Sequence, residues 1–277
     1  LASRAALKLG SGLVYVGLLD PEPPSVDLNQ PELMLRRPEA VLQSDLRALA
    51  CGPGLGRSSE ASRVLEQSLM CPVPVVLDAD ALNILATDGR LEGNLYNRVA
   101  PVILTPHPAE AARLLDCPIR EIQGDRVRAA CELAERYRSH IALKGCGTVI
   151  ATVDGRWWIN STGNPGMATA GMGDVLSGMI VALLAQGWPA EAALLAGVHL
   201  HGAAADRLRI GATWRGSSTA SRYRAGVLVA DRERGALRIG WSVELPARAH
   251  GLLAERDGGL LVVAVRPGRW LLRIDPQ

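Results

Sequence analysis

Short runs rich in β-branched residues alternate with longer stretches rich in Ala and Leu, from the start of the chain to about residue 206. This alternation is typical of a parallel sheet whose strands are connected by crossover helices. The runs are apolar and bounded by Gly, Pro or Asp, as strands buried on both faces should be. The fold class that follows is α/β, with a mostly parallel central sheet and flanking helices. We predict strands at 13–18, 73–77, 102–105 and 141–144, and helices at 60–70, 110–115 and 125–137.

One segment departs from the alternation. Two β-rich runs within 147–160 flank Asp154-Gly155, the strongest short signal for a hairpin. We therefore expect a local antiparallel pair beside the parallel strands. Two helices should follow, at about 174–186 and 189–206. No repeat or long polar linker interrupts 1–206, so this part is predicted to form one domain.

Residues 207–277 have a different composition. They hold 13 Arg against 6 acidic residues, whereas the whole chain has a formal net charge of only +2. Composition therefore gives no global reason to expect nucleic acid as a partner. We treat 207–277 as an Arg-rich C-terminal extension, for which the sequence predicts no particular structure.

The cysteines and the apolar runs indicate in which cellular compartment the protein is expected. The cysteines are odd in number, scattered and without a CxxC pair, which argues against a disulfide framework and a thiolate zinc site. No apolar run is long enough to span a bilayer, and residues 1–20 lack the pattern of a signal peptide. We expect a cytoplasmic protein without a membrane partner. The cysteines are Cys51, Cys71, Cys117, Cys131 and Cys146.

Small residues fill the segment 163–173, directly before an apolar helix. The start of a helix presents N–H groups without intrahelical partners, and glycine lets the backbone approach a phosphate closely. At the mouth of such an anion cradle, Asp174 could take the proton of a hydroxyl that attacks a phosphoryl group. The spacing matches neither a P-loop nor the dinucleotide fingerprint. The alternative is a tight turn in which Asp174 only caps the helix.

Four further segments lie at predicted strand ends, where open α/β sheets collect their ligands. In one of them Lys144 ends a strand and two glycines bracket a turn, so an ammonium, backbone amides and the Thr148 hydroxyl could meet a phosphate. A purely structural turn at a hairpin is the alternative. The segments are CGPGLG at 51–56, LDADALN at 77–83, LTPHPAE at 104–110 and LKGCGT at 143–148.

Histidines and aspartates in these regions have simpler interpretations. His107 lies between two prolines that fix its backbone, which favours a hydrogen-bonding role at a helix entry. Asp78 and Asp80 either cap the helix that follows or position a metal through water, and capping is the simpler interpretation. His199 and His201 are two positions apart on a helix and face different directions, unlike a helical zinc pair. We assign no metal-binding residue.

The ordered motifs resemble the ADP-dependent NAD(P)H-hydrate dehydratase family, the carbohydrate-kinase-like half of the bifunctional NAD(P)H-hydrate repair enzyme. The resemblance covers about 1–206 and implies a ribokinase-like three-layer sandwich. It also implies a lyase that repairs the (S)-hydrate of NADH or NADPH. ADP phosphorylates the hydroxyl of the hydrate, and elimination of that phosphate restores NAD(P)H and leaves AMP, with Mg²⁺ as cofactor. The motifs are GPGLG, LDADALN, LTPHPAE, LKGCGT, GNPGMAT and GMGDVLSG.

The resemblance implies roles for the residues at matching positions. Asp174 would be the catalytic base, and the amides of Gly171, Met172 and Gly173 would stabilise the phosphoryl charge. Gly56, His107 and Asp174 would contact the hydrate. The family also implies a homo-oligomer, a tetramer, and an epimerase domain or protein as partner. The nucleotide would be held by Lys144, Gly145, Cys146, Gly147, Thr148 and Gly173.

The chain departs from the family pattern in three places. The family's Gly/Ala-rich opening strand and turn, which contribute to the hydrate pocket, would precede Leu1. The epimerase domain is absent from the sequence. Residues 225–231, AGVLVAD, are loosely similar to the family's closing GLLATDL, but 232–277 have no counterpart. They are either an added β-rich extension or an aberrant reading of the coding sequence.

Two other functions compete with the dehydratase. The first is another ribokinase-like small-molecule kinase, such as a hydroxyethylthiazole kinase, which would leave a stable phosphorylated product instead of releasing phosphate. The second is an inactive nucleotide-binding remnant, because the loss of an element that lines a pocket can abolish positioning while the cradle stays intact.

Overall fold

A computed structural model describes residues 1–208 and four short strands beyond them, at 228–231, 236–239, 263–265 and 270–272. The helices are α1 (Ala2–Lys8), α2 (Pro38–Leu42), α3 (Ser59–Met70), α4 (Asp80–Leu85), α5 (Arg90–Tyr96), α6 (Pro108–Leu114), α7 (Ile119–Gly124), α8 (Arg126–Tyr137), the 3₁₀ turn η1 (Pro165–Met167), α9 (Met172–Ala185) and α10 (Ala190–Leu208). The strands are β1 (Tyr15–Gly17), β2 (Met34–Arg36), β3 (Leu49–Cys51), β4 (Val75–Leu77), β5 (Val102–Leu104), β6 (His140–Leu143), β7 (Val149–Ala151), β8 (Trp157–Ile159), β9 (Leu228–Asp231), β10 (Ala236–Ile239), β11 (Val263–Val265) and β12 (Trp270–Leu272).

The central sheet has six strands in the order β3-β4-β5-β6-β7-β8. The first four are parallel to one another, whereas β7 pairs antiparallel with both β6 and β8. This confirms the predicted parallel sheet and the predicted hairpin, whose turn contains Asp154 and Gly155. Because β3 to β6 are parallel, the loops that follow them leave from the same edge of the sheet.

Within 1–208, three strands differ from the prediction, since β2 and β3 were not predicted and β1 lies outside the main sheet. The predicted strand at 13–18 forms as β1, but it pairs only with β2 in a separate two-stranded parallel sheet. Strand β3, Leu49–Cys51, was not predicted, and it forms the edge of the main sheet before the CGPGLG segment. Its sequence, Leu-Ala-Cys, contains no β-branched or aromatic residue, and its pairing with β4 supplies the stabilising hydrogen bonds.

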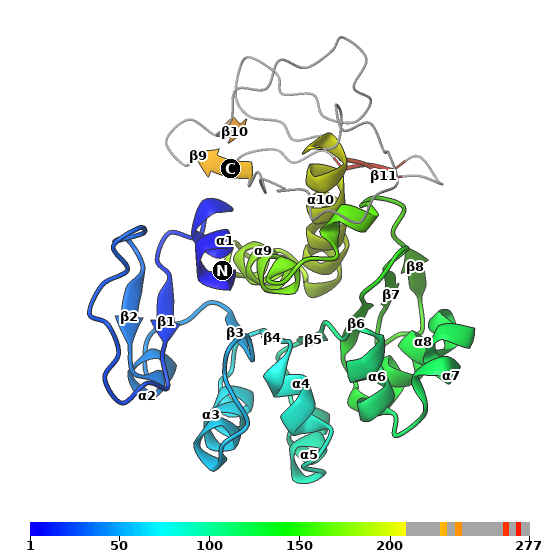
Figure 1. Ribbon diagram of the computed structural model, residues 1–277, viewed down its shortest axis with the longest axis horizontal. Coiled ribbons are helices and arrows are strands. Elements are labelled where there is room, and N and C mark those ends of the chain that lie inside the picture. Colours follow the sequence, from blue (N-terminus) through cyan, green and yellow to red (C-terminus); the bar gives the residue numbers. More distant parts are fainter. Residues whose placement is uncertain (209–227, 232–235, 240–262, 266–269, 273–277) are drawn as a thin grey trace.

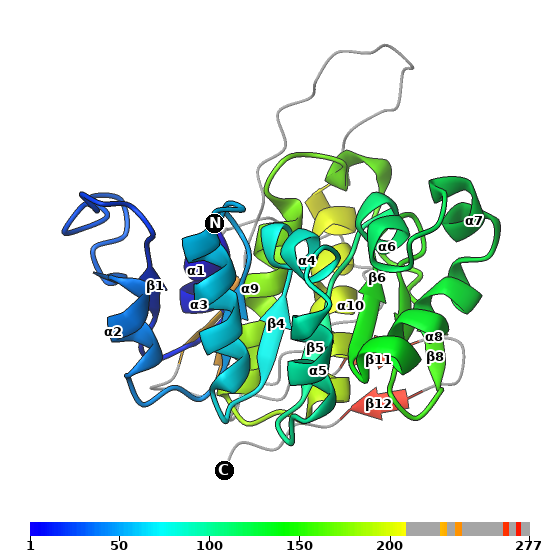
Figure 2. The ribbon, with the colours of Figure 1, turned by 90° about the horizontal axis from the view of Figure 1, so that it is seen from below.

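Helices cover both faces of the sheet and make a three-layer molecule. Figure 1 shows α1, α9 and α10 on one face and α3 to α8 on the other. In Figure 2, seen from below, α3, α4, α5 and α6 lie in front of the strands. Within 1–208, no helix is both long and apolar enough to cross a membrane.

The strands divide their side chains between two apolar clusters. In β4, Val75 and Leu77 belong to the cluster under α3 to α8, while Val76 between them belongs to the cluster under α1, α9 and α10. The same alternation holds in β5, where Leu104 and Ile103 face opposite layers. Successive side chains of a strand point to opposite faces, so an uninterrupted apolar run is needed to fill both layers.

Candidate active site

Three strand ends meet at Lys144, which directly follows β6. Its Nζ lies 2.6 Å from Oδ1 of Asp78, the residue after β4, and 3.9 Å from Oε2 of Glu110 in α6. The two carboxylate side chains are only 2% and 5% exposed. The lysine is therefore held at the carboxyl edge of the sheet by two buried acids.

The start of α9 faces this lysine. A Cβ on Gly173 would lie 3.2 Å from Lys144 Nζ and 3.5 Å from Asp78 Oδ2, so any side chain at 173 would crowd the ion pair. One turn further along α9, Ser177 donates a 2.7 Å hydrogen bond to the same Oδ2. The structure thus brings together Lys144 and Gly173, two residues predicted to hold a nucleotide.

Asp174 lies in the first turn of α9 and does not cap it. The N-cap is Gly171, whose φ of 87° is a left-handed conformation that favours glycine, and no side chain caps this helix. The interpretation of Asp174 as a mere cap is therefore wrong. Its half-buried carboxylate makes no hydrogen bond or ion pair with another described residue. The helix dipole favours a negative charge at this position.

The predicted nucleotide turn after Lys144 is organised by Arg126, a residue that the sequence did not single out. Arg126 donates from Nη1 to the carbonyl oxygens of Cys146 (2.7 Å) and Gly147 (3.0 Å), and from Nη2 to that of Leu143 (2.9 Å). Burial lowers the pKa of this guanidinium. The Thr148 hydroxyl donates to the Gly145 carbonyl at 3.2 Å and closes the turn. Arg126 is the first residue of α8, so no local pattern links it to this turn.

His107 is the N-cap of α6, which confirms its predicted role at a helix entry. Its Nδ1 accepts from the amides of Ala109 (3.1 Å) and Glu110 (3.2 Å), and Glu110 Oε2 accepts the His107 amide at 2.8 Å. Burial raises the pKa of the Glu110 carboxyl, and the Lys144 ammonium opposes the rise. His107 is thereby connected to the lysine through Glu110.

Asp78 and Asp80 do not cap the helix after them, contrary to the simpler of their two interpretations. Helix α4 begins at Asp80 with Ala79 as N-cap and no side-chain capping bond. Asp80 instead accepts the amide of Gly56 at 2.9 Å, which ties the CGPGLG loop to the start of α4. Within the described residues, no three His, Cys, Asp or Glu side chains are grouped as metal ligands would be.

The loop before α9 is attached to α10 by Asp206, another residue that the sequence did not single out. Asp206 accepts the amide of Gly163 at 2.7 Å on Oδ2 and the Nδ2 of Asn164 at 3.0 Å on Oδ1. Asn164 in turn accepts the Gly166 amide at 3.0 Å and caps η1. The beginning of the glycine-rich segment is therefore held against α10 by these hydrogen bonds.

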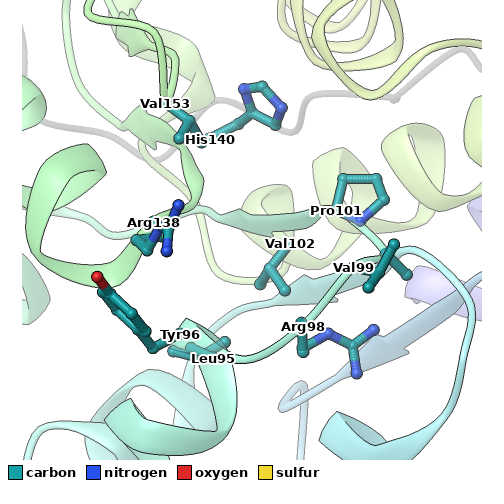
Figure 3. Close-up of a pocket in the computed structure, with 10 residues that line it drawn as sticks. Leu95, Tyr96, Arg98, Val99, Pro101, Val102, Arg138, His140 and Val153 are labelled. Carbon is teal, nitrogen blue, oxygen red and sulfur yellow. The ribbon is translucent and has the colours of Figure 1, made fainter.

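A surface pocket lies away from these residues, at the opposite edge of the sheet where β5 and β6 begin (Figure 3). No residue predicted for the nucleotide or the hydrate lines it. Its lining residues are Leu95, Tyr96, Arg98, Val99, Ala100, Pro101, Val102, Arg138, His140 and Val153.

A mostly parallel sheet flanked by helices, with a lysine at a strand end opposite a glycine-rich helix start, is the architecture of a ribokinase-like α/β protein. A ribokinase-like superfamily protein from Enterococcus faecalis has this fold, with a TM-score of 0.63 at 28% identity over 76% of this chain and 74% of that chain. The predicted fold class is confirmed. More specifically, the chain belongs to the NAD(P)H-hydrate dehydratase family, whose sequence profile matches residues 1–221.

Individual relatives agree with this family. The ADP-dependent (S)-NAD(P)H-hydrate dehydratase of Neisseria meningitidis is 44% identical over 213 residues, 76% of this chain and 72% of that protein. The solved ADP/ATP-dependent NAD(P)H-hydrate dehydratase of Bacillus subtilis, co-crystallised with ATP and Mg²⁺, gives a TM-score of 0.64 at 34% identity over 76% of each chain. The match to the bifunctional NAD(P)H-hydrate repair enzyme Nnr of Escherichia coli, at 41% identity, spans only 40% of that longer protein.

Proposed function

We propose that this chain is an ADP-dependent lyase that dehydrates the (S)-hydrate of NADH or NADPH and restores the reduced cofactor. One observation carries the proposal: Lys144 and the glycine-rich start of α9 meet beside Asp174, which has no partner among the described side chains. An ammonium and a helix N-terminus suit a phosphate, and a free carboxylate next to them suits a base. The family and the relatives supply the chemical identity of the substrate.

The proposed reaction has two steps. Asp174 accepts the proton of the hydrate's hydroxyl while that oxygen attacks the terminal phosphorus of ADP and AMP leaves. The phosphate then departs with the C–O bond electrons as the neighbouring ring carbon loses a proton to water, which restores the double bond. The amides at the start of α9, from Gly171 to Gly173, stabilise the charge on the transferred group.

The remaining predicted residues have places in this proposal. The turn after β6 would hold the nucleotide through Lys144, Gly145, Cys146, Gly147 and Thr148, together with Gly173. Gly56 and His107, on the loops after β3 and β5, would contact the hydrate. Since no described group of three acidic, His or Cys side chains is present, the site fits a Mg²⁺ ion carried by the nucleotide's phosphates better than a resident ion. When bound, that ion neutralises phosphate charge.

The proposal extends to the assembly. The catalytic domain would comprise 1–206, and 207–277 would be an extension whose residues fall largely outside those that the structure describes. An epimerase, on another protein or domain, would supply the S form of the hydrate. The family resemblance suggests a tetramer of identical chains.

The direct test combines the purified chain with NADH hydrate, ADP and Mg²⁺. The proposal expects the absorbance of reduced nicotinamide to appear together with equal amounts of AMP and inorganic phosphate. A stable phosphorylated substrate without phosphate release would instead identify a small-molecule kinase. Nucleotide binding without any product would identify an inactive remnant.

A further inference from the structure

We propose that Asp78 is a positioning residue that holds the Lys144 ammonium in place and also sets the rotation of α9, and with it the direction of Asp174. The inference rests on the proposed function only for the role of Asp174. Its observable basis is a single buried carboxylate that contacts the ends of two strands and the second turn of the catalytic helix.

Each oxygen of Asp78 has a defined partner. Oδ1 accepts from Lys144 Nζ at 2.6 Å and from the Ala79 amide at 2.9 Å, and Oδ2 accepts from Ser177 Oγ at 2.7 Å. Asp78 is only 1% exposed, and Ser177 is fully buried. Charge-assisted hydrogen bonds of this length are strong, and in a buried site they hold the participating groups in one arrangement.

The contact between Asp78 and Ser177 restrains α9, the helix that carries Asp174. Ser177 lies three residues after Asp174, and residues at this spacing lie on neighbouring positions of one helix face. Since Ser177 is bonded to a group outside α9, the bond restricts rotation of the helix about its axis. The same bond therefore limits where the Asp174 carboxylate can point.

The contact with Lys144 acts on the nucleotide site. Two acids compete for this ammonium, Asp78 at 2.6 Å and Glu110 at 3.9 Å. Asp78 lies on the side of α9, since its Oδ2 is 3.5 Å from the Cβ position of Gly173. Without the Asp78 charge, the ammonium would be drawn towards Glu110 and away from the start of the helix.

The backbone beside Asp78 supports a role in positioning. Ala79 has φ 51° and ψ −117°, a conformation that alanine rarely adopts, and its amide donates to Asp78 Oδ1. Strained residues of this kind persist where the surrounding structure determines them and cluster at functional sites. The strain lets the chain turn from β4 into α4 while the Asp78 carboxylate stays under α9.

The first experiment measures ADP binding by calorimetry for the wild type, Asp78→Asn, Lys144→Met and the double variant. We expect Asp78→Asn to weaken ADP binding about tenfold or more, and the double variant to bind about as weakly as Lys144→Met alone, because both changes remove one arrangement. Wild-type affinity in Asp78→Asn, or two losses that simply add, would overturn the link to Lys144.

The second experiment isolates the link to α9 with Ser177→Ala. We expect kcat to fall several-fold while the Kd for ADP stays within about twofold, since the lysine keeps its partner. Ser68→Ala is the matched control, because Ser68 is equally buried and its hydroxyl also makes a 2.7 Å hydrogen bond, to the Val64 carbonyl in α3. Equal kcat losses in the two serine variants would show a merely structural effect and overturn this link.

Thermal unfolding of every variant accompanies both experiments. If Asp78→Asn does not fold, Asp78→Glu keeps the charge and tests its placement: a folded Asp78→Glu protein with wild-type ADP affinity and kcat would contradict the proposal. Failure of the proposed function itself looks different. The wild-type chain would then yield no product, while the ADP affinities of the variants would still decide the role of Asp78 towards Lys144.

Discussion

Strand β6 runs from the edge of the sheet that holds the surface pocket to the edge that holds Lys144. The two edges are alike in their buried histidines and differ in how their charges are paired. It begins with His140 beside the pocket of Figure 3 and leads into Lys144 at the candidate active site. Each edge has a histidine with a buried ring nitrogen that has no hydrogen-bond partner within the described part of the chain, His140 Nδ1 and His201 Nε2. Burial lowers the pKa of both, that of His201 to about 4 with help from the Lys144 ammonium.

The edges differ in how their charges are paired. At the candidate active site, Lys144 is shared by two buried carboxylates. Among the residues that line the pocket there is no acid: Arg98 donates to the carbonyls of Leu69 and Val73, and Arg138 lies over the Tyr96 ring at 4.4 Å. Buried histidines occur at both edges and therefore do not distinguish them. Paired buried charges beside a helix start occur at the Lys144 edge, and we propose the active site there for this reason.

The largest expected effect is that of Asp174→Asn. The amide keeps the size of the side chain but cannot accept the hydroxyl proton, so turnover should fall roughly 10²- to 10⁴-fold. ADP binding should survive within about threefold. Release of AMP and phosphate measures the first quantity, and calorimetry measures the second. Turnover near the wild-type rate would remove Asp174 from the mechanism.

Lys144→Met should come next. It removes the ammonium and leaves Asp78 and Glu110 buried without their cation, so we expect the KM for ADP to rise about tenfold or more and the melting temperature to fall. Lys8→Met is the control, because Lys8 is an exposed lysine in α1. If both lysine variants shifted KM alike, the effect would be one of net charge, not of this site.

Gly173→Ala should have an intermediate effect. The added methyl would lie 3.2 Å from Lys144 Nζ, and displacement of the ammonium should lower kcat/KM about tenfold. Gly93→Ala in α5 is the matched control, since its Cβ would meet no atom within 4 Å and alanine favours a helix. Unchanged kcat/KM in Gly173→Ala would mean that the close approach is not needed for catalysis.

The two histidines predict a pH dependence of stability at both edges. The folded pKa of His201 is depressed to about 4, so its stabilising contribution is present above the unfolded value near 6.5 and is lost as the pH falls towards 4. The free energy of unfolding should drop by up to about 1.4 kcal/mol per pH unit in this window. Free energies of unfolding, measured by urea unfolding at several pH values, should depend less steeply on pH in His201→Gln than in the wild type. The pH dependence of the free energy of unfolding should also be weaker in His140→Gln, because the pKa of His140 is lowered as well.

The smallest effect is expected at the pocket. Arg138→Ala removes the stacking on Tyr96, which contributes up to about 1 kcal/mol at an exposed site. The kcat and KM should stay within about twofold of the wild type, since this edge lies across the sheet from Lys144. Steady-state kinetics would test this, and a large loss of activity would show that the two edges are coupled.

Local sequence patterns predicted most of the regular structure. The apolar runs became β4, β5 and β6, Asp154-Gly155 lies in the turn between β7 and β8, and the glycine-rich segment precedes α9. The pattern failed for β3, whose Leu-Ala-Cys sequence lacks β-branched residues, and for β1, which pairs with β2 outside the main sheet. Short strands carry too few residues to show which partner they will have.

The sequence by itself determined the α/β alternation, the order of the motifs and the identity of Lys144 and Asp174 as the side chains of interest, because these depend on composition and spacing along the chain. Only the tertiary structure determined which residues form hydrogen bonds that position these side chains and their helix. The bonds from Asp78 to Lys144 and Ser177 and from Asp206 to Gly163 connect residues 66, 99 and 43 positions apart. Local spacing does not reveal such partners, since it is the alignment of the strand ends in the folded sheet that places them side by side.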